Sequence, residues 1–120
     1  MIVLGIDPGI ATVGYGIIEV INNKYSVIDV GVIETSSKTP FSKRLHELYN
    51  KTNNLIEKYK PDEIAIEELF FAKNTKTAMI VSQARGVLIL SCANSNKPIF
   101  EYTPLQIKQG ITGSGRADKI

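Results

Sequence analysis

The chain has 120 residues, 43% of them hydrophobic, a size that fits one globular domain with a single buried core. Fourteen Lys and Arg against twelve Asp and Glu give a formal charge of +2, which permits an anionic partner without requiring one. The single cysteine, Cys92, excludes an internal disulfide and a cysteine-based zinc site, and favours a reducing, cytoplasmic environment. No apolar run approaches the ~18 residues of a membrane span, and the N-terminus lacks a signal-peptide pattern.

Three β-rich runs open the chain. Residues 2–6 form a continuous apolar and β-branched run, which predicts a strand buried on both faces. Residues 12–21 and 25–33 are two further runs, and Asn22 and Asn23 between them are typical of a hairpin turn. We therefore expect three strands in antiparallel order.

After residue 40 the apolar period changes from strand-like to helical. Apolar positions from Leu45 to Tyr59 recur at steps of three and four, which predicts an amphipathic helix that Pro61 ends. The pattern then predicts a buried strand over 62–69, a helix over 75–94, a strand over 98–102 and a short helix opened by Pro104. This order indicates an α/β fold with a mixed sheet and helices packed on it.

Two carboxylates fall at the predicted ends of buried strands. A right-handed crossover would place the first and fourth strands side by side, so Asp7 and Glu67 would meet at one edge of the sheet. Unpaired, they would repel and pay a large desolvation cost, whereas a divalent cation such as Mg²⁺ removes both problems. Gly5 and Gly9 leave room for a phosphate. The alternative is that Asp7, Pro8 and Gly9 form an ordinary turn.

Three segments, GIDPGIATVGYGII, PDEIAIEELFFAKNTKTAMIVSQARGV and FEYTPLQIKQGITGSGRADK, lie in an order and spacing that resemble the RuvC family of Holliday-junction resolvases. The resemblance implies an RNase H-like fold: a mixed five-stranded sheet flanked by helices, as one domain over residues 1–120. It also implies a Mg²⁺-dependent endonuclease that cuts opposed strands of four-way DNA junctions in recombination and repair.

The resemblance also implies roles for particular residues. Asp7 and Glu67 match catalytic carboxylates that hold two Mg²⁺ ions, with Mn²⁺ as an alternative. Phe70 matches an aromatic wedge at the junction centre, while Lys108 and Lys119 match lysines that contact DNA. Lys73 can reach a neighbouring phosphate. The implied partners are a second copy of the chain, four-way junction DNA and the RuvA–RuvB branch-migration complex.

One departure from the family pattern concerns the C-terminal end. The family's two remaining carboxylates lie on a helix beyond the position of Lys119, and this chain stops at Ile120. We therefore expect residues 1–120 to form a domain without that helix. Such a domain should bind Mg²⁺ weakly and cleave DNA weakly or not at all.

Several residues and functions stay open at this stage. Strand alternation places Glu68 on the face opposite to Glu67, so we do not assign it to metal. Phe71 favours a core position and His46 a surface position, and Arg85 can pair with a carboxylate in the core or at a subunit interface. The alternative functions are a YqgF-type RNA-processing nuclease, a lobe of an actin-like ATPase or sugar kinase, and a non-catalytic junction-binding module.

Overall fold

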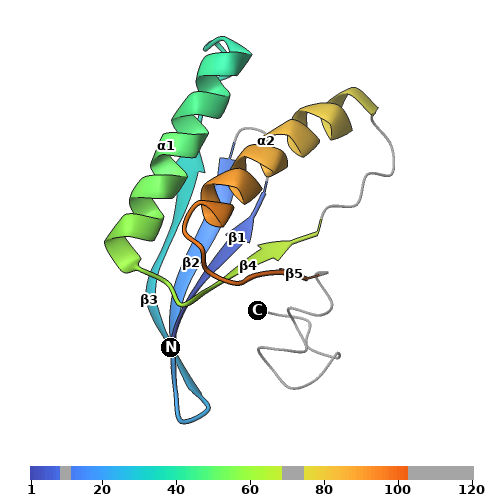
Figure 1. Ribbon diagram of the computed structural model, residues 1–120. Coiled ribbons are helices and arrows are strands. Elements are labelled where there is room, and N and C mark those ends of the chain that lie inside the picture. The colour runs from blue at the N-terminus through green and yellow to red at the C-terminus, as the bar shows by residue number, and fades with distance from the viewer. Residues whose placement is uncertain (9–11, 69–74, 103–120) are drawn as a thin grey trace.

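The computed structural model describes residues 1–8, 12–68 and 75–102 (Figure 1). In chain order its elements are β1 (Ile2–Asp7), β2 (Thr12–Ile21), β3 (Lys24–Glu34), α1 (Phe41–Tyr59), β4 (Glu63–Glu67), α2 (Thr75–Ala93) and β5 (Ile99–Tyr102). All seven agree with elements predicted from the sequence to within a few residues. The predicted helix after Pro104 lies outside the described residues.

The five strands form one mixed sheet in the order β3-β2-β1-β4-β5. β1 pairs antiparallel with β2, and β2 pairs antiparallel with β3. β4 runs parallel to both β1 and β5, as the crossover argument predicted for β1. Asn22 and Asn23 both have positive φ in the turn between β2 and β3, a conformation that asparagine tolerates better than most residues.

Both described helices lie on the same side of the sheet and contact each other (Figure 1). Side-chain hydrogen bonds join them: Ser91 donates to Asn53, and Asn94 Nδ2 donates to the Tyr49 hydroxyl at 2.5 Å. α1 ends at a left-handed Lys60 before Pro61, because proline cannot continue the helical hydrogen-bond ladder. None of the helices in the described ranges is long and apolar enough to span a membrane.

The hydrophobic core fills the space between the sheet and the two helices. Alternate residues of the central strands point into it, together with one face of each helix: Leu4, Ile6, Val13, Ile17, Ile33, Leu48, Ile64, Ile66, Ala84, Leu88 and Cys92.

Burial raises the pKa of the Cys92 thiol to about 11, so this thiol stays protonated at neutral pH.

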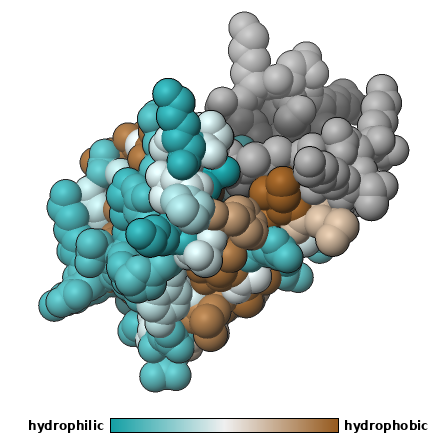
Figure 2. All heavy atoms as spheres, turned by 90° about the horizontal axis from the view of Figure 1, so that it is seen from above, coloured by the Kyte–Doolittle hydropathy of each residue, from teal (hydrophilic) through white to brown (hydrophobic). Residues whose placement is uncertain are grey.

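The opposite face of the sheet is only partly buried. The prediction that the first strand is buried on both faces is therefore wrong for this face, where Val3 and Gly5 are half-buried, because both described helices cover the other side. Val30 and Val32 of β3 and Phe100 of β5 are exposed there. Seen from above, in Figure 2, apolar side chains also lie among hydrophilic ones at the described surface.

Gly31 of β3 provides a test of packing on the helix side. An added Cβ would lie 2.5 Å from the Tyr15 hydroxyl oxygen and 2.7 Å from ring carbon Cζ, whereas at Gly16 it would meet nothing within 4 Å. We expect Gly31→Ala to lower the free energy of unfolding by roughly 1–3 kcal/mol, because the ring must move. Urea denaturation measures this, with Gly16→Ala as the control. Equal stability of the two variants would contradict the prediction.

Candidate metal-dependent nuclease site

Asp7 and Glu67 are the last residues of two adjacent parallel strands. The ladder between β1 and β4 runs from Val3–Glu63 to Ile6–Ile66, so the next level places Asp7 beside Glu67. Alternation puts both side chains on the face away from the helices. Their meeting was predicted from the sequence, and the register supports it.

Asp62 fixes this register at the opposite end of the two strands. The backbone N–H of Ile2 donates to Asp62 Oδ2 at 2.7 Å, and the backbone N–H of Asp62 donates to the Ile2 carbonyl at 2.7 Å. A slip of β4 by one residue would break both bonds and turn Glu67 into the core. This role of Asp62, at the beginning of a predicted strand, was not predicted from the sequence.

The two carboxyl groups are close enough to influence each other's protonation. Burial, a side-chain hydrogen bond with Asp7 and the negative charge of Asp7 together raise the pKa of Glu67 to about 7. A hydrogen bond between two carboxyl groups requires that one of them carries a proton. Without a cation, Glu67 therefore carries a proton in about half of the molecules at pH 7.

Small residues surround the pair on the same face of the sheet. Gly5, Gly14, Gly16 and Ala65 occupy this face beside Asp7. A Cβ at Gly14 would lie 3.8 Å from Asp7 Cβ and so would stand next to the carboxylate. The absence of side chains here leaves the carboxylates accessible to a bulky phosphate. We predicted this role for Gly5 but not for Gly14 and Gly16, although their alternation with Tyr15 was a visible signal.

The oxygen-rich chemistry of the pair suits a hard divalent cation such as Mg²⁺, which prefers carboxylate ligands and keeps several waters. Within residues 1–8, 12–68 and 75–102, no group of three or more His, Cys, Asp or Glu side chains is placed to hold an ion. The candidate cation site in the described part of the chain therefore consists of the two carboxyl groups of Asp7 and Glu67.

Six residues singled out from the sequence lie outside the described residues: the predicted DNA contacts Phe70, Lys73, Lys108 and Lys119, and also Gly9 and Phe71.

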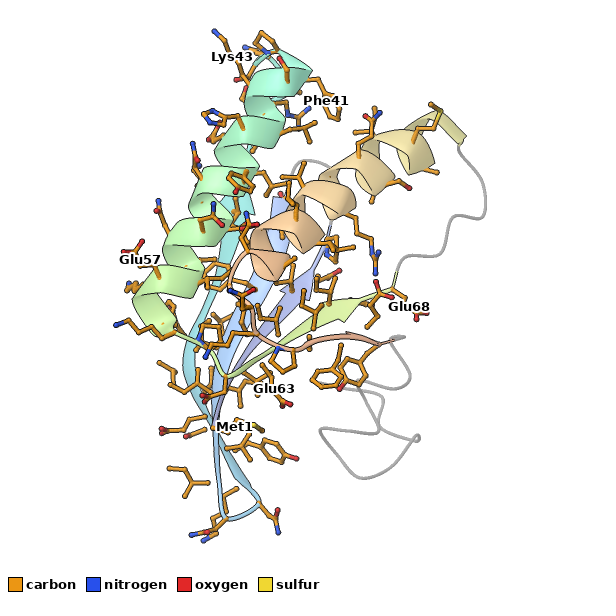
Figure 3. All side chains as sticks on the ribbon, viewed as in Figure 1. Met1, Phe41, Lys43, Glu57, Glu63 and Glu68 are labelled. Carbon is orange, nitrogen blue, oxygen red and sulfur yellow. The ribbon has the colours of Figure 1, made fainter. Side chains whose placement is uncertain are left out.

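Three other side chains singled out from the sequence are described. Glu68 directly follows β4, and Glu63 lies at the other end of the same strand (Figure 3). The backbone N–H of Glu68 donates to the Tyr102 carbonyl at 2.6 Å. The strand alternation thus continues, and Glu68 belongs to the face away from Glu67. His46 lies on α1, 3.4 Å from Asn50 Nδ2, at an exposed contact. Arg85 pairs with Glu101, whose side chain is exposed, so its partner is not the core carboxylate that was one of the two options.

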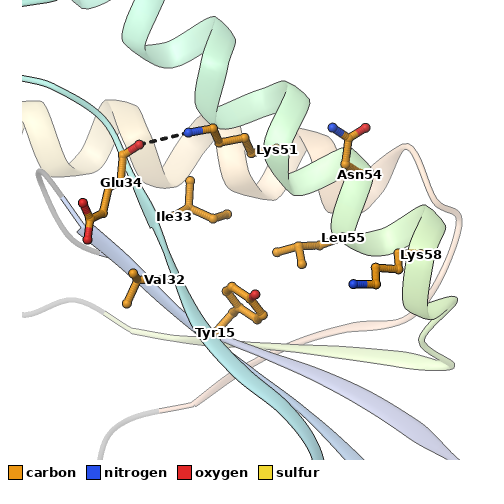
Figure 4. A pocket seen from close by; sticks show the side chains of 8 residues that line it. All are labelled: Tyr15, Val32, Ile33, Glu34, Lys51, Asn54, Leu55 and Lys58. Atoms are coloured by element: carbon orange, nitrogen blue, oxygen red, sulfur yellow. Dashed lines mark hydrogen bonds between the residues drawn. The ribbon is translucent and has the colours of Figure 1, made fainter.

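A separate pocket of about 290 Å³ lies between β3 and α1 (Figure 4). Its lining residues are Tyr15, Val32, Ile33, Glu34, Lys51, Asn54, Leu55 and Lys58. Lys51 Nζ donates to the Glu34 carbonyl at 3.2 Å and pairs with Glu47 at 2.7 Å. Neither Asp7 nor Glu67 lines this pocket, so it is distinct from the carboxylate site.

Comparison with known proteins agrees with this geometry. The sequence model described as "Crossover junction endodeoxyribonuclease RuvC" matches residues 3–120. The crossover junction endodeoxyribonuclease RuvC of Caldicellulosiruptor saccharolyticus is 60% identical over 99% of this chain and 72% of its own length. The Thermus thermophilus RuvC structure superposes with a TM-score of 0.86 at 30% identity, covering 99% of this chain and 74% of that one. T. thermophilus RuvC in complex with a Holliday junction substrate gives 0.83 at 29% identity, covering 91% and 68%.

The mixed five-stranded sheet and the carboxylate pair at its central strand ends define a nuclease of the RNase H-like class. Within that class, the chain belongs to the RuvC family of crossover junction endodeoxyribonucleases, which are metal-dependent hydrolases. The family match favours the resolvase interpretation over the YqgF-type nuclease and the actin-like or sugar-kinase lobe.

The shared proton predicts a pH dependence of stability. The pKa of Glu67 rises from its ordinary 4.5 to about 7 on folding, so between these values the folded chain keeps a proton that the unfolded chain has lost. The free energy of unfolding, measured with a chelator present to remove trace metal, should therefore decrease as the pH rises from about 4.5 to about 7.

Denaturant titrations across this pH range test the effect. Glu67→Gln should remove this part of the pH dependence, because glutamine has no proton to lose. Glu63→Gln, at the other end of β4, is the matched control and should retain it. A Glu67→Gln profile parallel to that of the unmodified chain would contradict the assignment.

Proposed function

We propose that this chain acts on four-way DNA junctions as a Holliday-junction resolvase, cutting opposed strands by metal-dependent phosphodiester hydrolysis. The observation that carries the proposal is the pairing of Asp7 with Glu67 at the ends of β1 and β4, in a chain of the RuvC family. The solved complex of T. thermophilus RuvC with a Holliday junction substrate supports the choice of DNA substrate.

Asp7 and Glu67 would hold a divalent cation, and we propose Mg²⁺, with Mn²⁺ as a substitute. When bound, such an ion polarises a phosphodiester oxygen and lowers the pKa of a bound water. The chain's own residues position the cation by fixing both carboxylates on rigid strands. Cation binding would displace the proton that the pair shares, so metal affinity should increase with pH near 7.

The remaining roles concern DNA. The small residues at Gly5, Gly14 and Gly16 leave room for the phosphate backbone to approach Asp7. In this proposal Phe70 inserts as a wedge at the junction, and Lys73, Lys108 and Lys119 contact phosphates. The partnership with RuvA–RuvB rests on the family resemblance. The proposed cytoplasmic location also takes account of the single buried thiol of Cys92.

The test is incubation of the 120-residue chain with a labelled four-way junction and a linear duplex of the same sequence in Mg²⁺. We expect tighter binding to the junction than to the duplex, an affinity that falls steeply between about 50 and 200 mM salt, and weak paired nicks near the crossover. Asp7→Asn should abolish the nicks because it removes a metal-ligating charge.

Glu63→Gln, a carboxylate substitution at the start of β4, controls for general loss of charge. Junction-selective binding with no nicks in any variant would favour the non-catalytic binding module. Equal affinity for junction and duplex, or nicks that Asp7→Asn retains, would contradict the proposal.

We further propose that the chain forms a two-fold dimer through the exposed face of α2, which would place two sites on opposed strands of the junction. Among the α2 side chains that the structure describes, residues 78–93, the exposed ones carry no charge: Met79, Ser82, Gln83, Gly86, Leu90 and Ala93. Met79 is 61% and Leu90 55% exposed, which is unusual for two large apolar side chains on one helix face. Gly86 would allow the backbones of two helices to approach closely.

Leu90→Glu should weaken this dimer. The two-fold symmetry duplicates each introduced carboxylate at the interface, at a cost on the order of 2 kcal/mol or more, which corresponds to at least about a thirtyfold rise in the dissociation constant. Sedimentation velocity over a concentration series measures the change. Val30→Glu, which adds the same charge to an exposed position of β3, is the control and should leave association unchanged. A Leu90→Glu chain that dimerises as the unmodified chain does would exclude α2 as the interface.

A further inference from the structure

Among the described residues, the last registered strand pair of β4 is made with β5 and not with β1. The registered pairs between β1 and β4 end at Ile6–Ile66, whereas those between β4 and β5 continue to Glu67–Tyr102. Beyond that level, the backbone N–H of Glu68 donates to the Tyr102 carbonyl at 2.6 Å. Among the described residues, β5 is therefore the strand against which the end of β4 is registered.

β5 is itself weakly supported by the sheet. It is four residues long, and among the described strands it lies at the edge of the sheet, next to β4 (Figure 1). The two rings on its outer face, Phe100 and Tyr102, contact each other at 6.3 Å between centroids. Edge strands of this length need support from elsewhere in the molecule.

An ion pair supplies that support from α2. Arg85 Nη2 lies 2.5 Å from Glu101 Oε1, one residue before Tyr102. The Arg85 side chain is 18% exposed and that of Glu101 47%. Arg85 Nε is buried and has no hydrogen-bond partner within the described part of the chain, so Glu101 is the residue that balances this cation there.

We propose that Arg85 is a positioning residue for the carboxylate site. Its ion pair with Glu101 fixes the position of β5 relative to α2. The pairing of β5 with β4 in turn fixes the backbone of Glu67 in the register at which its carboxyl group faces Asp7. Arg85 itself lies on the helix side of the sheet and touches neither substrate nor cation. The inference rests on the proposed metal site and assigns to it a residue that the sequence left open.

A stabilising pair and a positioning pair predict different results for Arg85→Met. Methionine fills similar space and removes the buried cation, while the half-exposed Glu101 can be solvated by water. The melting temperature should therefore change little. If Arg85 positions Glu67, Mn²⁺ affinity should nevertheless fall roughly tenfold, the lower range seen when outer partners of metal ligands are removed. Exchange of the Glu68 amide proton should also accelerate, because its bond to Tyr102 depends on the position of β5.

The measurement is Mn²⁺ titration followed by electron paramagnetic resonance, with amide hydrogen exchange on the same samples. Lys51→Met, which removes the i,i+4 pair with Glu47 on α1, is the matched control and should change neither quantity. Glu101→Gln weakens the pair from the other side and should lower Mn²⁺ affinity in the same direction, so it decides the question if Arg85→Met does not fold.

Wild-type Mn²⁺ affinity in the folded Arg85 and Glu101 variants would overturn the positioning role and leave the proposed function intact. An unmodified chain that binds no Mn²⁺, or that binds it equally well after Asp7→Asn, would overturn the proposed metal site and this inference with it.

Discussion

The parallel pairing of β1 with β4 is the contact on which the site depends. It joins two segments far apart in the chain, and it ends at the level where two carboxyl groups face each other. The cost of that meeting is offset on the opposite face, where four side chains of these strands are buried against the helices: Leu4, Ile6, Ile64 and Ile66. Each contributes about 1.5–3 kcal/mol by burial, and a shared proton removes much of the repulsion between the carboxyl groups.

Much of this arrangement was predictable from local patterns. The β-branched runs, the Asn22 and Asn23 turn and the three-and-four spacing of α1 each determine an element from residues that are close in sequence. The crossover rule then placed Asp7 and Glu67 at neighbouring strand ends. These predictions succeeded because they require only the period of the apolar residues and the handedness of one connection.

The parts that could not be predicted depend on contacts between elements. The raised pKa of Glu67 follows from its burial and its distance from Asp7, which the order of strands alone does not give. Arg85 pairs with Glu101 only because the fold brings α2 and the edge strand within reach of one arginine side chain. The half-buried outer face of β1 was missed because a continuous apolar run fits a strand covered on both sides, and the run contains no information about where the helices lie.

The separation of the two faces has a consequence for how the sequence can vary. Along the central strands, alternate residues face the core: Leu4, Ile6, Val13, Ile17, Ile64 and Ile66. The residues between them face the site: Gly5, Asp7, Gly14, Gly16, Ala65 and Glu67. Residues that stabilise the fold and residues that form the site thus alternate along the same strands. Repacking one set can change how strongly the domain folds while the other set, and the surface it presents, keeps its shape.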